Sequence, residues 1–208
     1  MSNDMSSPII LLISAPSGAG KTTVCNALLA ANSNLRRVVT STTRPARPGE
    51  QHGVDYHFFS AGEFARRREA DEFLEHASVY DRAYGTLKSS VLDLLAADHD
   101  VLLNIDVQGA ASVRQVAARD PVLRRALVTV FLTPPTLAEL EVRLRGRGAD
   151  PEAVIARRLA EARGEAGRWS EFDYLVVSDT RAEDSRRMQA IYDTERLRSV
   201  RAEFALKV

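Results

Sequence analysis

The sequence predicts an α/β fold in which helices cover both faces of a parallel β-sheet. Two observations support this class. Short apolar runs of strand length alternate with segments of helical period, and a glycine-bearing turn joins the first strand to the first helix. Two stretches interrupt the alternation, and we expect one to form a small mixed-β insertion and the other a helical lid.

Continuous apolar runs are typical of strands buried on both faces. The runs expected to form the parallel sheet are Ile9–Ser14, Leu102–Ile105, Leu127–Leu132 and Tyr174–Val177. The helices expected with them are Thr22–Ala31, Val91–Ala97, Gly109–Ala118, Thr136–Arg145 and an amphipathic final helix over Asp184–Ala205. Capping boxes support two helix starts, at Ser60-x-x-Glu63 and at Thr136-x-x-Glu139.

The two interruptions define the expected sub-domains. Between Val38 and Tyr84, the β-type segments Gly53–Phe59 and Phe73–Tyr80 flank one short helix. Between Arg143 and Arg168, helix formers and frequent arginines predict a charged helical hairpin. We therefore expect one domain over residues 1–208, with a core of 8–36, 86–142 and 170–208, an insertion over about 37–85 and a lid over about 143–169.

Composition is that of a globular protein, with 45% apolar and 27% charged residues. The 28 acidic and 28 basic side chains give no net charge, which argues against a surface built to coat nucleic acid. Cys25 is the only cysteine, so an intramolecular disulfide is excluded and a reducing compartment fits. The first residues lack the features of a secretory signal, and Ile9–Ile13 is too short to span a bilayer. We expect a cytoplasmic protein with no membrane partner.

The strongest local signal follows the first strand, where the segment from Ala15 to Thr22 reads Ala-Pro-Ser-Gly-Ala-Gly-Lys-Thr. A strand, this turn and a helix predict a P-loop and hence a fold of the P-loop NTPase type. Inward N–H groups and the helix N-terminus would bind a phosphate. We expect Lys21 to neutralise the β- and γ-phosphates of ATP and the Thr22 hydroxyl to hold Mg²⁺. The expected ATP-binding residues are Ala15, Pro16, Ser17, Gly18, Ala19, Gly20, Lys21, Thr22 and Thr23.

The segment beyond the first helix offers a second anion site. Arg44 and Arg47 flank Pro45 in a stiff loop, and their guanidinium groups could converge on one phosphate. Tyr56 and Tyr84 could add hydroxyl donors. On charge alone, the two arginines could equally be a solvated loop pair.

Glu75 is a carboxylate in an otherwise apolar predicted strand. A carboxylate accepts from two parallel donors, which fits the N1–H and 2-amino groups of guanine and opposes adenine, whose N1 is an acceptor. By itself, Glu75 could equally face outward from a half-exposed strand. Beside the two arginines and two tyrosines, it is a candidate for reading a guanine base.

These residues belong to a set of motifs that resembles the guanylate kinase family over nearly the whole chain. The motifs are the phosphate loop, Ser41-Thr-Thr-Arg-x-x-Arg-x-Gly-Glu-x-x-Gly-x-Asp-Tyr-x-Phe58, Phe73-Leu-Glu-His76, Tyr84-Gly-Thr86, Ile105-Asp-x-Gln-Gly109, Phe131-Leu-x-Pro-Pro135 and Arg143-Leu-Arg-Gly-Arg-Gly148. The resemblance implies transfer of a phosphoryl group from MgATP to GMP, and to dGMP, by a monomer or homodimer whose lid closes over the reaction.

The resemblance also implies a role for each site residue. Arg44, Arg47, Tyr56 and Tyr84 would bind the GMP phosphate. The guanine would be surrounded by Thr40 or Ser41, Glu75, Thr86 and Asp106, with Gly85 between Tyr84 and Thr86 completing the substrate-binding set. Lys21, Arg143, Arg147 and Arg158 would gather on the transferring phosphoryl group.

The sequence departs from the family pattern at three places. Ala15 replaces the first glycine of the loop, which costs little where the backbone φ is negative. Asn104 stands where the family usually has a carboxylate, so we expect a weaker Mg²⁺ or guanine network. Ser178-Asp179 replaces the usual Asn-Asp near the adenine edge, and we expect altered ATP affinity.

Two other functions fit parts of the same sequence pattern. Guanylate-kinase-like folds also occur as phosphopeptide-binding scaffold modules, which are expected to lose the phosphate-loop or lid chemistry that Lys21, Thr22 and the lid arginines represent here. A P-loop kinase of another small acceptor, or a nucleotide sensor, would have little use for Glu75 and Thr86. The sequence therefore favours a guanylate kinase.

Overall fold

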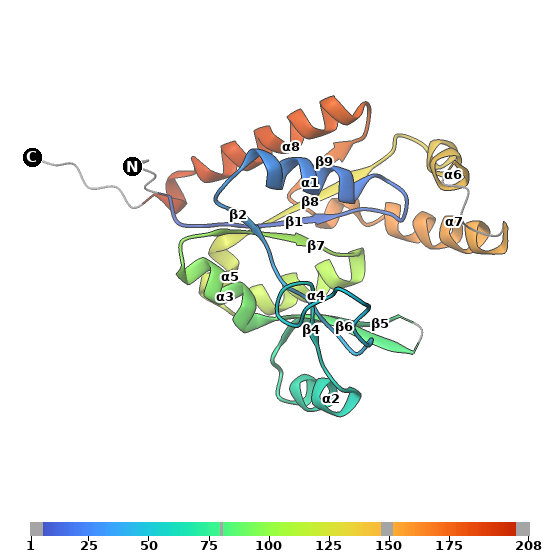
Figure 1. The fold of residues 1–208 in the computed structure, drawn as a ribbon. Helices are drawn as coiled ribbons and strands as arrows, with labels where there is room; N and C mark the ends of the chain where they lie inside the picture. The colour runs from blue at the N-terminus through green and yellow to red at the C-terminus, as the bar shows by residue number, and fades with distance from the viewer. Residues whose placement is uncertain (1–5, 80, 147–151, 203–208) are drawn as a thin grey trace, which may run out of the picture.

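The computed structural model describes residues 6–79, 81–146 and 152–202, and its core is a five-stranded parallel sheet (Figure 1). The strand order is β2-β7-β1-β8-β9. The strands are β2 (Leu35–Arg37), β7 (Asp100–Asn104), β1 (Ile10–Ser14), β8 (Leu127–Thr133) and β9 (Tyr174–Val177). All neighbouring pairs are parallel, which confirms the predicted fold class. The central strand β1 is buried on both faces, as its unbroken apolar run predicts.

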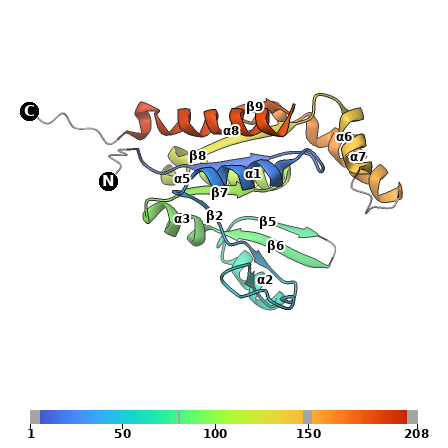
Figure 2. The ribbon, with the colours of Figure 1, turned by 45° about the horizontal axis from the view of Figure 1, so that its top comes forward.

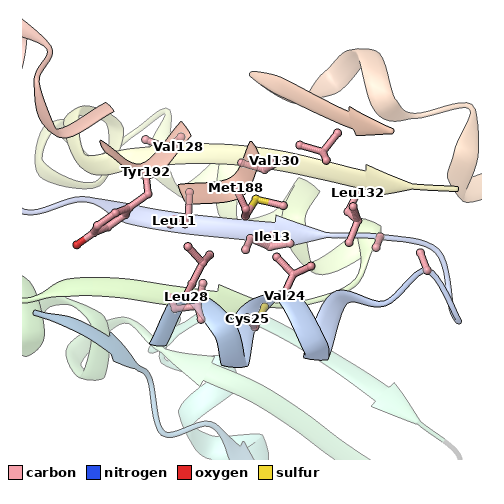
Figure 3. Packing of buried hydrophobic residues seen from close by; sticks show 14 of the residues in the cluster. Leu11, Ile13, Val24, Cys25, Leu28, Val128, Val130, Leu132, Met188 and Tyr192 are labelled. Carbon is pink, nitrogen blue, oxygen red and sulfur yellow. The ribbon is translucent and has the colours of Figure 1, made fainter. Parts of the chain in front are cut away.

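Helices cover each face of this sheet in two separate layers (Figure 2). On one face, α1 (Lys21–Ala31) and α8 (Arg181–Arg196) pack on Leu11 and Ile13, together with Val128 and Val130 of β8 (Figure 3). On the other face, α3 (Lys88–Ala96), α4 (Val107–Ala117) and α5 (Pro121–Ala126) pack on Ile10 and Leu12. Alternate residues of β1 thus supply the two cores. Within the described residues, no helix has both the length and the apolar character needed to cross a membrane.

A second sheet lies beyond the core, in the order β4-β3-β6-β5. It contains β4 (His57–Phe58), β3 (Ser41–Thr42), β6 (Arg82–Leu87) and β5 (Phe73–Val79), with α2 (Ala61–Glu69) beside it. The sheet is mixed, because β3 is parallel to β4 and antiparallel to β6. The predicted strand over Gly53–Phe59 is too long, since Gly53 has a φ of 80° and its N–H donates to Tyr56 O in a turn. Tyr80, at the predicted end of β5, lies outside the described residues.

Two helices extend past the carboxyl edge of the core sheet, α6 (Leu137–Arg145) and α7 (Glu152–Ala166). Their inner faces join the core of the α1 side through Leu140, Leu144, Ile155 and Ala162. Both predicted capping residues act as caps, because Ser60 Oγ accepts from Glu63 N and Thr136 Oγ1 accepts from Glu139 N, each at 3.1 Å. The segments η1 (Trp169–Glu171) and η2 (Ser199–Arg201) are short 3₁₀ helices.

The final helix is shorter at its C-terminus than predicted and begins earlier. Thr180 caps α8 by accepting from Glu183 N, so the helix begins at Arg181. It ends at Arg196, and the chain then turns back so that the buried guanidinium of Arg201 pairs with the buried Glu195 carboxylate at 2.7 Å. This ion pair and the Ser7 N–H bond to Arg201 O place the two ends of the described chain side by side.

Asp100, at the start of β7, connects three elements of the core. Its carboxylate is 1% exposed, accepts from Ile9 N at 2.8 Å and accepts from the Tyr192 hydroxyl at 2.5 Å. A buried carboxylate with these partners fixes α8 to the sheet between β7 and β1, because an unmade bond at this depth is costly.

We expect Tyr192→Phe to lower the free energy of unfolding by about 1–3 kcal/mol, because it leaves one oxygen of the buried Asp100 carboxylate without its hydroxyl donor. Urea denaturation would measure the change. Asp193→Asn, at the next and exposed position of α8, is the matched control and should change stability by less than about 0.5 kcal/mol. Equal stability of Tyr192→Phe and the parent protein would contradict this role of Asp100.

Candidate active site

The phosphate loop lies at the carboxyl edge of the sheet, between the end of β1 at Ser14 and the start of α1 at Lys21. Gly18 and Gly20 have φ values of 95° and 99°. A Cβ on Gly18 would lie 2.8 Å from Leu144 Cδ2, so this position also requires the absence of a side chain. Ala15 is buried and does not have a positive φ, which explains why alanine is accommodated there.

Lys21 lies in a cavity of about 300 Å³ that the loop forms with Asp106 and Glu165. Its Nζ donates to Ile105 O at 2.8 Å, which fixes the ammonium at the junction of β1 and β7. Burial lowers the pKa of Lys21, whereas the charges of Asp106, Cys25 and Glu165 oppose that shift. The loop, an ammonium group and an exposed Thr22 thus line one polar cavity suited to phosphates.

The residues expected around the guanine lie close together between β5, β6 and α4. Glu75 is 8% exposed, and Thr86 Oγ1 donates to its Oε1 at 2.6 Å. Burial raises the pKa of Glu75, and the nearby Asp106 raises it further. Asp106 caps α4 by accepting from Gly109 N at 2.7 Å. A Cβ on Gly109 would lie 3.3 Å from Glu75 Oε2 and 3.4 Å from Asp106 Oδ1, so the glycine allows both carboxylates to approach α4.

Two further expected residues lie in or directly before β3, the strand that pairs with β6. Ser41 pairs with Gly85 in the β3–β6 register, and its buried Oγ has no hydrogen-bond partner among the described residues. Thr40 precedes β3, and its carbonyl accepts from His57 N at 2.8 Å. The second sheet therefore carries a buried carboxylate and two hydroxyl groups in one region.

The residues expected to bind the acceptor phosphate form a second group, around Arg44. Its guanidinium lies 5.3 Å from the centre of the Tyr56 ring, and Tyr84 interacts with it as well. Sequence analysis missed the Glu50 carboxylate, which accepts two bonds from Arg44 at 2.8 and 2.9 Å and one from Arg47 N at 2.7 Å. These bonds lower the pKa of Glu50 to about 2, and Glu50 in turn raises the pKa of Arg44. The Arg47 side chain is exposed next to this group.

A second cavity, of about 490 Å³, lies on the α8 side of the phosphate loop. Arg143 Nη1 donates to Ser178 Oγ at 3.0 Å and to Ala19 O at 3.4 Å. Ser178 Oγ donates to Asp184 Oδ2 at 2.6 Å, so the single hydroxyl is bonded on both sides. Asp184, which the sequence offered only as the beginning of a helix, also accepts from Asp179 N at 2.8 Å.

Of the three expected lid arginines, the structure places Arg143 directly against the loop. Arg158 is half-buried on α7, and Arg147 lies outside the described residues. The convergence of all three on one phosphoryl group therefore stays a prediction.

Comparison with known proteins gives consistent matches. The sequence model described as guanylate kinase matches residues 5–195. The guanylate kinase of Nitrosococcus oceani is 46% identical over 198 residues, covering 95% of this chain and 94% of the relative. That of Hydrogenovibrio crunogenus is 48% identical over 170 residues, covering 82% and 80%. The crystal structure of guanylate kinase from Anaplasma phagocytophilum superposes with a TM-score of 0.70 at 31% identity, covering 95% of this chain and 91% of that one.

We expect Gly18→Ala to destabilise the fold more than Gly20→Ala does. Both changes place a side chain at positive φ, but only the first meets Leu144, whereas no atom lies within 4 Å of a Cβ on Gly20. The difference should be about 1–3 kcal/mol in the free energy of unfolding, as for other overpacked sites. The double variant Gly18→Ala with Leu144→Ala should be less destabilised than the sum of its parts. Strict additivity in denaturant titrations would disprove the contact.

Proposed function

This chain belongs to the guanylate kinase family and transfers a phosphoryl group from ATP to GMP, and we propose that the residues described above carry out that reaction. The motif resemblance is confirmed by the family match and by the similarity to solved structures. The observation that supports the residue assignment best is the buried Glu75 carboxylate, bonded to Thr86 and near Asp106. Asp106 also lines the phosphate-loop cavity, so it connects the two halves of the proposed site.

On the acceptor side, Glu75 would accept from the N1–H and 2-amino groups of guanine. Its second oxygen lies toward Gly109 and is available for this pairing while Thr86 holds the first. Thr40, Asp106 and the Ser41 hydroxyl, which has no hydrogen-bond partner among the described residues, would complete the base contacts. Adenine would place an acceptor against the carboxylate and would be rejected, because a buried polar site penalises a mispaired base.

The GMP phosphate would bind at Arg44, Arg47, Tyr56 and Tyr84. The Glu50 carboxylate already holds Arg44 in a bidentate geometry, which is the geometry that a phosphate takes with arginine. Since none of these groups would contact the ribose 2′-hydroxyl, we propose that dGMP is also accepted.

On the donor side, the backbone of Ala15 to Thr23 would bind the ATP phosphates, and Lys21 would neutralise the β- and γ-phosphates. An oxygen of the GMP phosphate attacks the γ-phosphorus as the bond to the β–γ bridging oxygen breaks, giving GDP and ADP. Arg143, Arg147 and Arg158 would stabilise the charge on the equatorial oxygens. The acceptor oxygen is already anionic at neutral pH, so no general base is needed.

Mg²⁺ would enter with ATP. The Thr22 hydroxyl and the Asp106 carboxylate line the same cavity and offer the oxygen ligands that Mg²⁺ prefers. Among the described residues, no cluster of three or more His, Cys, Asp or Glu residues forms a protein-only metal site, which fits an ion held largely by substrate phosphates. Bound there, Mg²⁺ would neutralise the developing charge between the β- and γ-phosphates.

The sub-domain roles, the cellular location, the assembly state and the partners of this protein are also proposals. We propose that residues of about 37–85 act as the GMP-binding sub-domain and those of about 143–169 as the lid, in a cytoplasmic monomer or homodimer. We propose that its partners are GMP and ATP, without nucleic acid or membrane. The zero net charge and the single cysteine support these assignments.

We expect GMP and dGMP to be phosphorylated from MgATP, and AMP, CMP and UMP to react about 10⁴-fold less efficiently. Glu75→Gln should lower kcat/KM for GMP by roughly 100-fold or more, because the amide presents a donor where guanine needs an acceptor. Lys21→Ala should lower kcat by about 10²–10³. A coupled assay of ADP release measures all three. Undiminished GMP turnover by the Glu75→Gln variant would remove the base reader from the mechanism.

GMP affinity should fall as the pH is lowered, because only the charged Glu75 accepts both guanine donors. The pKa of Glu75 is raised above its ordinary value of 4.5, so the pH at which half of the Glu75 carboxylates are protonated also lies above that value. Isothermal titration calorimetry from neutral pH down to about pH 5 would measure the dissociation constant. The Glu75→Gln variant is the control, since it retains the titration of GMP itself. Parallel pH profiles of the two proteins would contradict this prediction.

A further inference from the structure

Glu165 is a charged residue of the phosphate-loop cavity to which the proposed mechanism gives no role. It lies in the last turn of α7 and lines the cavity with Lys21, Thr22 and Asp106. Ser17, within the phosphate loop, lines the same cavity, and its backbone N–H acts on the Glu165 carboxylate as a stabilising dipole. A side chain from the lid region thus reaches the groups expected to bind the donor phosphates.

Some groups around Glu165 stabilise its charged form, and others destabilise it. The pKa of Glu165 is raised overall, because burial and the negative charges of Asp106 and Glu161 outweigh the opposite effects of Lys21 and the Ser17 N–H. The groups that stabilise the carboxylate are therefore those of the anion-binding loop itself. A carboxylate oxygen and a phosphate oxygen need the same hydrogen-bond donors, and two anions inside one cavity repel each other.

We propose that Glu165 is a positioning residue of the donor site, whose carboxylate takes the place of a donor phosphate on the loop until ATP displaces it. This inference rests on the proposed function, because it assigns the donor phosphates to this cavity. Glu165 keeps a counter-charge beside Lys21 and the loop N–H groups, and it lowers the affinity for the incoming polyphosphate by competing for them.

Displacement of the Glu165 carboxylate by the phosphates of ATP would also act on α7, a helix of the expected lid. Glu165 shares α7 with Arg158, so the phosphates that expel the carboxylate act on the helix that carries an expected lid arginine. Beyond α7 the chain is fixed, because Glu171 pairs with both Arg168 and Arg114 of α4.

Binding to Glu165→Gln tests the proposal, since glutamine keeps the size of the side chain and removes its charge. Isothermal titration calorimetry with MgATP, and separately with magnesium tripolyphosphate, should show roughly three- to tenfold tighter binding of both ligands, because a like charge is removed. In steady-state assays the KM for ATP should fall by a similar factor, with the KM for GMP little changed.

Glu161→Gln is the matched control, because Glu161 lies one turn earlier on α7 and its carboxylate is 59% exposed and paired with Arg157. The Glu161 charge acts on Glu165 only through space and is screened by solvent, so Glu161→Gln should tighten the binding of both ligands by less than about twofold. Unchanged or weaker binding of both ligands by folded Glu165→Gln would overturn the proposal, and weaker binding would identify Glu165 as a group that supports the donor site. These titrations need no turnover, so they stand apart from the assay of GMP phosphorylation that tests the function itself.

Discussion

The phosphate loop concentrates positive charge at the carboxyl edge of the sheet. The other groups of the site are arranged around this charge. It depends on a buried β1 that ends at Ser14 and on an α1 whose first residue is Lys21. The Lys21 ammonium is held at this edge, because its Nζ donates to the carbonyl of Ile105, which follows the neighbouring strand β7. Acidic groups from two other elements, Asp106 and Glu165, complete the same cavity. The relative positions of Lys21 and Asp106 thus follow from the pairing of β1 with β7.

Asp106 joins this donor centre to the acceptor centre on the second sheet. It follows β7, caps α4, lines the loop cavity and influences the charge of Glu75. The two sheets have no strand in common, so their relative position at the site depends on contacts between α4 and β5. Gly109 is central to that contact, because a side chain there would crowd both carboxylates. A small residue at the start of α4 therefore allows the carboxylates of Glu75 and Asp106 to lie close to this helix.

Sequence predicted the elements that carry a local signal and missed those that depend on tertiary pairing. The loop glycines, the Ser60 and Thr136 caps and the long apolar strands are local, and the structure has them. Strands β2 and β6 were missed, since a run of three residues or one containing Arg82 and Gly85 shows no clear periodicity. Glu50, Glu165 and Asp184 were missed for a different reason. An acidic residue in a loop or on a charged helix is ordinarily solvated, and only the folded chain shows which cation or N–H group it meets.

These three carboxylates suggest how the site keeps its cations in position before substrates arrive. Glu50 holds Arg44 in a bidentate pair, Asp184 orients Ser178 and through it Arg143, and Glu165 faces Lys21 and the loop. Without these carboxylates the three cationic side chains would adopt many rotamers. In the proposed reaction, a phosphate oxygen therefore replaces a carboxylate oxygen at Arg44 and at the loop, and binding is an exchange of anions at prearranged donors. Such an exchange weakens the net attraction between substrate and protein. In return, the cations need little reorganisation in the transition state, because preorganised charge is most effective there.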